Sequence, residues 1–224
     1  MPFLNPTYIL ALFVAISVHE WAHAVTATKL GDPTPGHAGR LTLNPIAHLD
    51  LVGALLFLTV GFGWAKPVPI NPVYFRNYKR DTCLTAAAGP FSNLVLAIVA
   101  FTMLKIFGGA AGSSPWELLS VGGSGPVVRI FLLQFLGAFL FINLGLMAFN
   151  LIPIAPLDGS KVLEAFIPLS LSDRYEEFMR IGIYVLIGLL LAENFLHIPL
   201  LSLWIVTIME WVLHTMESVS ALFL

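Results

Sequence analysis

Long runs of apolar residues, separated by shorter polar stretches, dominate this sequence. A helix needs about 20 consecutive apolar residues to cross the hydrocarbon core of a bilayer. Five runs reach or approach that length: about 7–29, 82–107, 127–150, 178–196 and 199–216. The pattern therefore predicts an all-α polytopic membrane protein with about five transmembrane helices.

A sixth apolar run, 51–64, is too short to cross comfortably. Runs of that length are more often re-entrant or buried against other helices. Stretches rich in Gly and Pro lie on both sides of it, at 31–50 and 65–81. Within the first of these, GRLTL (39–43) alternates enough to permit a strand. We therefore expect a short re-entrant segment and a small membrane-associated β element near 39–45.

Composition supports a membrane protein and narrows its chemistry. The chain has 224 residues, of which 58% are hydrophobic and only 11% are charged, whereas soluble domains are about 25% charged. The net charge of −2 gives no reason to expect a nucleic-acid partner. Cys83 is the only cysteine, which excludes an intrachain disulfide and a Cys-rich zinc site. No domain boundary is visible, so 1–224 is expected to form a single domain.

The basic residues indicate an orientation in the membrane. Segments 29–80 and 158–180 carry several Lys and Arg residues, whereas 108–126 carries none. By the positive-inside rule, the two basic segments face the cytoplasm. That requires 51–64 to return to the side from which it came. The N-terminus is then expected outside, the C-terminus in the cytoplasm, and any site near Lys29 towards the cytoplasmic side.

The first span contains the sequence HEWAH at 19–23, which matches the H-E-x-x-H pattern. On a helix, His19 and His23 lie one turn apart on the same face, so both imidazoles can reach one metal ion. Glu20 is offset around the helix, where it can act as a base on water at that ion. The motif predicts a zinc site with a catalytic glutamate.

The position of the motif strengthens this interpretation. His19 precedes Lys29 by ten residues, about 15 Å along a helix, which is well below the membrane surface. Ionisable side chains at that depth cost roughly 2.5–3.5 kcal/mol each on insertion scales, so a cluster of three needs a functional reason.

Catalytic zinc usually has three protein ligands, so a third ligand is needed. The run NLIPIAPLDG (150–159) favours Asp158, because Pro153 and Pro156 interrupt the third span where its apolar run ends. Irregular backbone at that depth is tolerated when it is buried in protein or lines a wet cavity. Glu164 is the next alternative, and the remaining acidic and histidine candidates are His48, Asp50 and Asp81.

Together these segments resemble the site-2 protease family of intramembrane metalloproteases. The similar pieces are HEWAH at 19–23, GRLTLNP at 39–45, GWAKPVPINP at 63–72, AGPFSN at 88–93 and NLIPIAPLDG at 150–159. They occur in the family's order and cover roughly residues 15–165. The chain looks like a minimal member without a PDZ or CBS domain.

The resemblance implies an intramembrane zinc endopeptidase that hydrolyses peptide bonds in or near transmembrane helices of membrane proteins. It implies Zn²⁺ on His19, His23 and Asp158, Glu20 as catalytic base, and Asn150 as the residue that binds the substrate carbonyl or the oxyanion. The catalytic core is expected at about 7–166, with accessory helices at about 176–217. The expected partners are the lipid bilayer and a transmembrane protein or peptide, in a prokaryotic plasma membrane; a homo-oligomer is compatible with the sequence.

Two other functions share some of these features. A metal-ion transporter also places His and acidic residues inside the membrane, and a non-catalytic protein could bind membrane helices without cutting them. Transport needs ligands at several depths, whereas the candidates here cluster in two segments. The intact HEWAH and LDG sequences argue against a non-catalytic protein.

Overall fold

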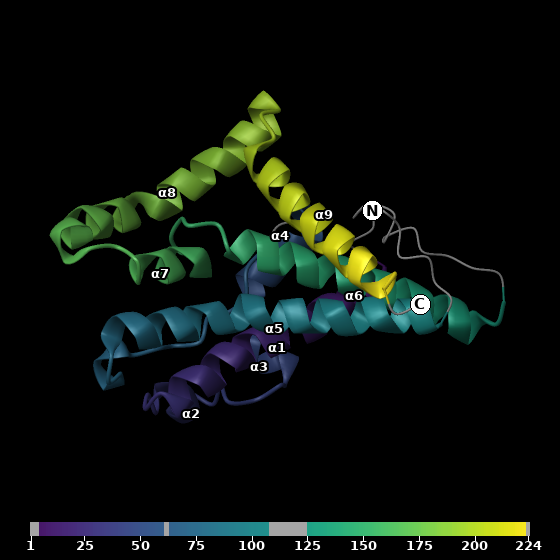
Figure 1. The fold of residues 1–224 in the computed structure, drawn as a ribbon, viewed down its shortest axis with the longest axis horizontal. Helices are drawn as coiled ribbons and strands as arrows, with labels where there is room; N and C mark the ends of the chain where they lie inside the picture. The colour runs from purple at the N-terminus through teal and green to yellow at the C-terminus, as the bar shows by residue number, and fades with distance from the viewer. Residues whose placement is uncertain (1–4, 61–62, 108–124, 223–224) are drawn as a thin grey trace.

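The computed structural model of the chain describes residues 5–60, 63–107 and 125–222 (Figure 1). Five of its helices are long and apolar enough to cross a membrane: α1 (Pro6–Lys29), α5 (Tyr78–Ile106), α6 (Val127–Asn150), α8 (Ser172–Leu196) and α9 (Leu200–Ser220). Four are short: α2 (Thr34–His37), α3 (Pro45–His48), α4 (Leu51–Val60) and α7 (Asp158–Glu164). The expected five long helices are confirmed. Most of the 108–126 segment lies outside the described residues.

Local sequence signals explain where the long helices begin and end. Asn5 caps α1 by accepting a hydrogen bond from the Thr7 amide, and Pro6 stands at the first helical position, where its missing N–H costs nothing. Asn77 caps α5 in the same manner. Helix α6 ends at Asn150, just before the prolines of the following turn.

Helices α1, α5 and α6 pack together and form the core that holds the site. Small residues make the approach close: Ala11, Ala15, Ala97 and Ala100 are completely buried. In lipid, such small residues favour helix association because they let backbones approach and pack. Larger buried side chains of α6, among them Leu140 and Leu144, fill the remaining space.

Helices α8 and α9 form a V-shaped pair beside this core (Figure 1). Helix α9 returns onto α6, where the Trp204 indole N–H donates to the Ala148 carbonyl over 2.9 Å. Helix α8 is the most exposed long helix, with only Gly182 and Leu186 buried. At Gly182 it lies directly against the backbone of Ala155, in the turn between α6 and α7.

The short apolar run forms α4, and after it the chain returns to the residues that precede α4. Leu49 and Ala65 form an isolated antiparallel bridge, and the Lys66 amide donates to the His48 carbonyl over 2.9 Å. Gly53 lies against the Trp64 backbone with no room for a side chain. The two ends of the segment 49–65 therefore lie side by side.

The prediction of a β element near 39–45 was wrong, because no strand occurs in the residues that the structure describes. Local hydrogen bonds use the backbone instead: the Arg40 amide donates to the Pro35 carbonyl, and Asn44 caps α3 through the Ile46 amide. An asparagine side chain such as that of Asn44 competes with strand pairing, because it offers the backbone a nearby hydrogen-bond partner. Only Leu41–Leu43 remain between these turns. Three residues with no neighbouring strand cannot form a β-ladder.

Candidate metal centre

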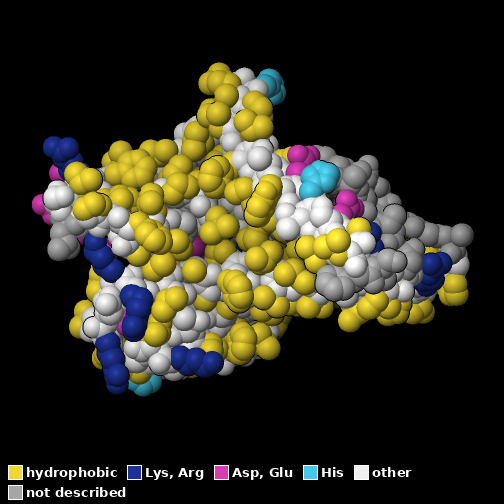
Figure 2. Space-filling view, in the orientation of Figure 1, with side chains coloured by type: hydrophobic (Ala, Val, Ile, Leu, Met, Phe, Trp, Pro, Cys, Tyr) yellow, Lys and Arg dark blue, Asp and Glu magenta, His cyan; other side chains and the backbone are white. Residues whose placement is uncertain are grey.

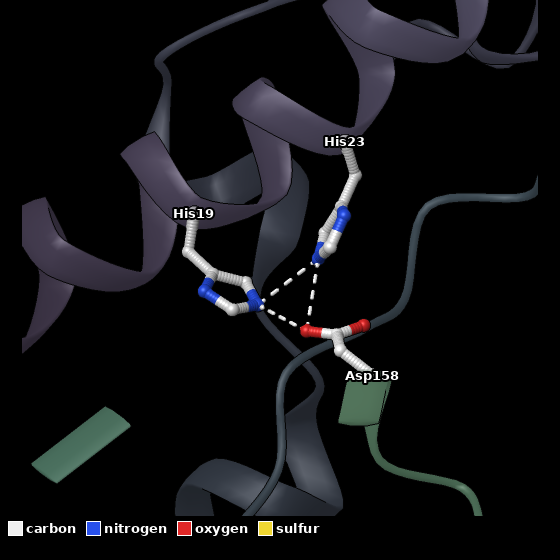
Figure 3. Close-up of side chains that lie close together, drawn as sticks. All are labelled: His19, His23 and Asp158. Atoms are coloured by element: carbon white, nitrogen blue, oxygen red, sulfur yellow. Dashed lines mark hydrogen bonds and ion pairs between the residues drawn. The ribbon is translucent and has the colours of Figure 1, made fainter. Parts of the chain in front are cut away.

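Three ligand atoms converge at the inner face of α1 (Figure 3). His19 and His23 lie one turn apart on that helix, and their Nε2 atoms are 3.1 Å from each other. Oδ2 of Asp158 lies 3.2 Å from Nε2 of His19 and 3.3 Å from Nε2 of His23. The structure thus brings together the three residues predicted as metal ligands, although Asp158 is 135 positions beyond His23 in sequence.

Asp158 reaches the two histidines because the chain turns sharply after α6. The turn at 151–157 returns the chain to the core, and Asp158 is the first residue of α7. Gly159 permits the close packing: a Cβ there would lie 2.6 Å from the Ile152 carbonyl oxygen. The Tyr175 hydroxyl donates to the Ser160 carbonyl, which ties α8 to the start of α7.

The outer nitrogens of both imidazoles are already used. Nδ1 of His19 lies 2.5 Å from Oδ1 of Asn93, and Nδ1 of His23 lies 2.7 Å from the Thr85 carbonyl oxygen. Because a carbonyl oxygen only accepts, Nδ1 of His23 is the donor. With one proton on each neutral ring, the Nε2 atoms carry lone pairs directed at each other and at Asp158.

This donor set fits zinc. Three electron-rich atoms within 3.3 Å repel one another unless a cation lies between them, and Oδ2 of Asp158 is buried without a hydrogen-bond donor among the described residues. Ligand atoms about 2.0–2.1 Å from a tetrahedral zinc are about 3.3 Å apart, which matches the observed separations.

Glu20 lies beside the trio but is not one of the converging ligands. Its carboxylate accepts a hydrogen bond from the Val68 amide over 3.2 Å. Val68 stands between Pro67 and Pro69 in the extended segment that follows α4. This bond holds one carboxylate oxygen, and leaves the other available for a proton.

Asn150 is not brought into contact with the ligands. Its amide nitrogen donates to the Leu146 carbonyl of its own helix over 3.0 Å. A carboxamide nitrogen carries two hydrogens, so one further donor remains.

The alternative third ligands are engaged elsewhere. Glu164 accepts from the Tyr78 hydroxyl and from Lys161, His48 bonds the Thr42 carbonyl, Asp50 accepts from the Gly53 amide, and Asp81 accepts from Asn77 and Arg80. Among the described residues, Asp158 is the carboxylate that meets the two histidines.

Sequence reasoning missed the residues around the ligands. Gly89 of the AGPFSN segment (88–93) lies directly against the ligands, because a Cβ there would lie 2.6 Å from two ring atoms of His19. Asn93 of the same segment bonds His19. An asparagine within an apolar span was the available signal, because a polar side chain there requires a partner.

Comparison with known proteins agrees with this geometry. A family model described as Peptidase family M50 matches residues 74–192, which include Asp158. "Putative zinc metalloprotease YwhC" of Bacillus subtilis is 41% identical over 165 residues, covering 74% of this chain and 71% of the relative. "Putative zinc metalloprotease Rip2" of Mycolicibacterium smegmatis is 27% identical, covering 88% and 69%. "Putative zinc metalloprotease MJ0611" of Methanocaldococcus jannaschii is 31% identical, covering 65% and 63%. No solved structure matches the chain.

The helical fold and the His-His-Asp group define a polytopic membrane protein with a metalloprotease site. The chain belongs to peptidase family M50, the site-2 protease family, and is therefore a zinc metalloprotease, a hydrolase.

Proposed function

We propose that this protein is an intramembrane zinc endopeptidase that hydrolyses peptide bonds in or near transmembrane helices of membrane proteins. The observation that carries the proposal is the convergence of His19, His23 and Asp158 inside an apolar helical core. The proposed catalytic core extends over about 7–166, and the helices at about 176–217 are accessory. Membership of the peptidase family supports a peptide substrate.

In this proposal His19, His23 and Asp158 hold the ion, which when bound supplies Lewis acidity that acidifies water and polarises a carbonyl group. Glu20 takes a proton from the attacking water and delivers a proton to the leaving amine. The Val68 amide keeps the Glu20 carboxylate oriented for this transfer. The remaining N–H of Asn150 donates to the oxygen that becomes negatively charged as the carbonyl is attacked.

The substrate must change conformation before it is cut. In a transmembrane helix, the backbone carbonyls are hydrogen-bonded and covered by side chains, so the target peptide has to unwind locally. Water must also reach the ligands. We expect substrates with helix-breaking residues near the cut site to be cleaved faster than their parents.

The proposal includes a location and an orientation. The protein is placed in a prokaryotic plasma membrane, with the N-terminus outside, the C-terminus in the cytoplasm and the site towards the cytoplasmic side. The Lys and Arg distribution supports this orientation, and the bacterial relatives support the compartment.

The test is cleavage of a panel of single-span proteins by purified protein in detergent, with wild type beside Glu20→Gln. The Gln variant keeps all three ligands, so both proteins should contain about one zinc per chain while only wild type cleaves. Equal cleavage by both would overturn the role of Glu20. If neither cleaves although both contain zinc, the metal-transporter alternative gains support, and zinc flux into proteoliposomes would be measured.

A further inference from the structure

A line of buried amide side chains connects one of the ligands to the interior of α6. Nδ1 of His19 lies 2.5 Å from Oδ1 of Asn93 on α5. Nδ2 of Asn93 lies 2.8 Å from Oδ1 of Asn143 on α6. Nδ2 of Asn143 lies 2.8 Å from the Phe139 carbonyl oxygen, four residues earlier on the same helix. Both asparagines are completely buried.

The chemistry at the far end fixes the direction of every bond in this line. The Phe139 carbonyl only accepts, so the NH₂ group of Asn143 must face it and the Asn143 oxygen must face Asn93. Asn93 must then present its NH₂ group to that oxygen and its own oxygen to His19. The Ala15 carbonyl, 3.5 Å from Nδ2 of Asn93, is a second acceptor on the same side. The bond between His19 and Oδ1 of Asn93 therefore has Nδ1–H of His19 as its donor.

We propose that Asn93 and Asn143 are positioning residues, which hold the proton of His19 on Nδ1 and so keep the Nε2 lone pair available to the metal. The inference rests on the proposed metal role of His19. Neither asparagine contacts the ligand group at Nε2; both act through the ring. We call this line of hydrogen bonds, from His19 through Asn93 to Asn143, the relay. It also fixes the plane of the His19 ring, because the bond to Asn93 ties that ring to α5.

The two histidines are oriented by different means. His23 is oriented by a backbone carbonyl, that of Thr85, which no side-chain substitution removes. His19 is oriented by side chains alone. Substitution of the asparagines should therefore weaken the metal site through His19, while the bond of His23 to Thr85 is kept.

The experiment compares zinc affinity with thermal stability in purified full-length variants in detergent. Affinity is measured by competition with a chromophoric zinc chelator, and stability by the melting temperature of the metal-free protein. The variants are Asn93→Leu, Asn143→Leu and Asn93→Asp, with Ser17→Ala as control. Ser17 is buried, and its hydroxyl donates only to the Phe13 carbonyl of its own helix.

Asn93→Leu should lose about 10- to 100-fold in zinc affinity, the usual effect of removing the hydrogen-bond partner of a ligating histidine. Asn143→Leu should lose less, because the Ala15 carbonyl still orients Asn93. Asn93→Asp keeps an acceptor for Nδ1–H but gives Asn143 an oxygen where it had an N–H donor. It should therefore bind zinc within a few-fold of wild type while melting at a lower temperature. Ser17→Ala should keep the affinity of wild type.

Two results would overturn the relay: wild-type affinity in Asn93→Leu, or affinities that simply follow the melting temperatures across all variants. The second result would show that the asparagines only join helices. If wild-type protein itself bound no zinc, the metal site would fail, and the relay with it. That outcome is distinguishable because it appears before any variant is compared.

Discussion

At the scale of single residues, Gly89 makes the metal site possible by having no side chain. It lies on α5 directly against the two imidazoles, and a Cβ there would be 2.6 Å from Cε1 and Nε2 of His19 and closer still to Nε2 of His23. Carbon atoms in ordinary contact are about 3.5–4.0 Å apart. Both imidazoles would have to move by about 1 Å to make room for the alanine methyl group.

Gly89→Ala should therefore lower zinc affinity by at least about tenfold, comparable to the loss of a hydrogen-bond partner of a ligand, and should abolish cleavage. The measurement is zinc per chain by elemental analysis after equilibration with limiting zinc. Gly145→Ala on α6 is the matched control, because a Cβ there meets nothing within 4 Å. Full zinc occupancy in Gly89→Ala would mean that the imidazoles do not occupy these positions in the metal-bound protein.

The choice of the third ligand can also be tested at one residue. Asp158→Asn keeps the shape of the side chain but replaces a charged ligand by a neutral one, so zinc affinity should fall by at least about tenfold. Glu164→Gln is the comparison, since Glu164 bonds Tyr78 and Lys161 instead. Chelator competition should show near wild-type affinity for the Gln variant. The reverse order of affinities would make Glu164 the ligand.

At the scale of elements, the turn between α6 and α7 decides where Asp158 lies, and α8 supports that turn. At Gly182 a Cβ would lie 2.7 Å from Cβ of Ala155 and 2.8–2.9 Å from its backbone O and N. Gly182→Ala should separate α8 from the turn and destabilise the protein by about 1–3 kcal/mol, the usual cost of overpacking. Thermal melts in detergent would measure this.

Gly188 provides the control on the same helix. A Cβ at Gly188 meets nothing within 4 Å, so Gly188→Ala should leave stability unchanged or raise it by up to about 1 kcal/mol through helix propensity. If both alanine variants melted alike, the close contact between α8 and the turn would not contribute to stability.

The helices could be predicted from the sequence, whereas the contacts between helices could not. The long helices follow from local apolar runs, and their positions agree with expectation because each span contains its own signal. The strand prediction at 39–45 failed because the alternation of Leu41 and Leu43 around Thr42 says nothing about a partner strand. The backbone groups there form local turn and cap hydrogen bonds instead. The convergence of His19, His23 and Asp158 was predictable because HEWAH and LDG restrict the chemistry. Asn93 and Gly89 were not, because their roles depend on how α5 meets α1.

At the scale of the whole molecule, the face drawn in Figure 2 has three zones along the long axis. On this face, most of the Lys and Arg side chains gather at the end where α2, the start of α5 and the start of α8 lie (Figures 1 and 2). A smaller basic group lies at the opposite end, and a broad apolar zone separates the two. HEWAH occupies the second half of α1, so the metal site lies towards the more basic end.

This asymmetry leads to a prediction about orientation. Because cytoplasmic loops carry the excess of Lys and Arg, the start of α5 should face the cytoplasm and the start of α6 the outside. In a Cys83→Ser background, a single cysteine at Val127→Cys should react with a membrane-impermeant maleimide on intact cells. Arg76→Cys should react only after the membrane is opened. Both positions are exposed, Val127 at 81%, so burial would not mask either one. Labelling of Arg76→Cys alone on intact cells would reverse the orientation and place the site towards the outside. Labelling of both would put the two positions on the same side and mean that α5, which lies between them, does not cross the membrane.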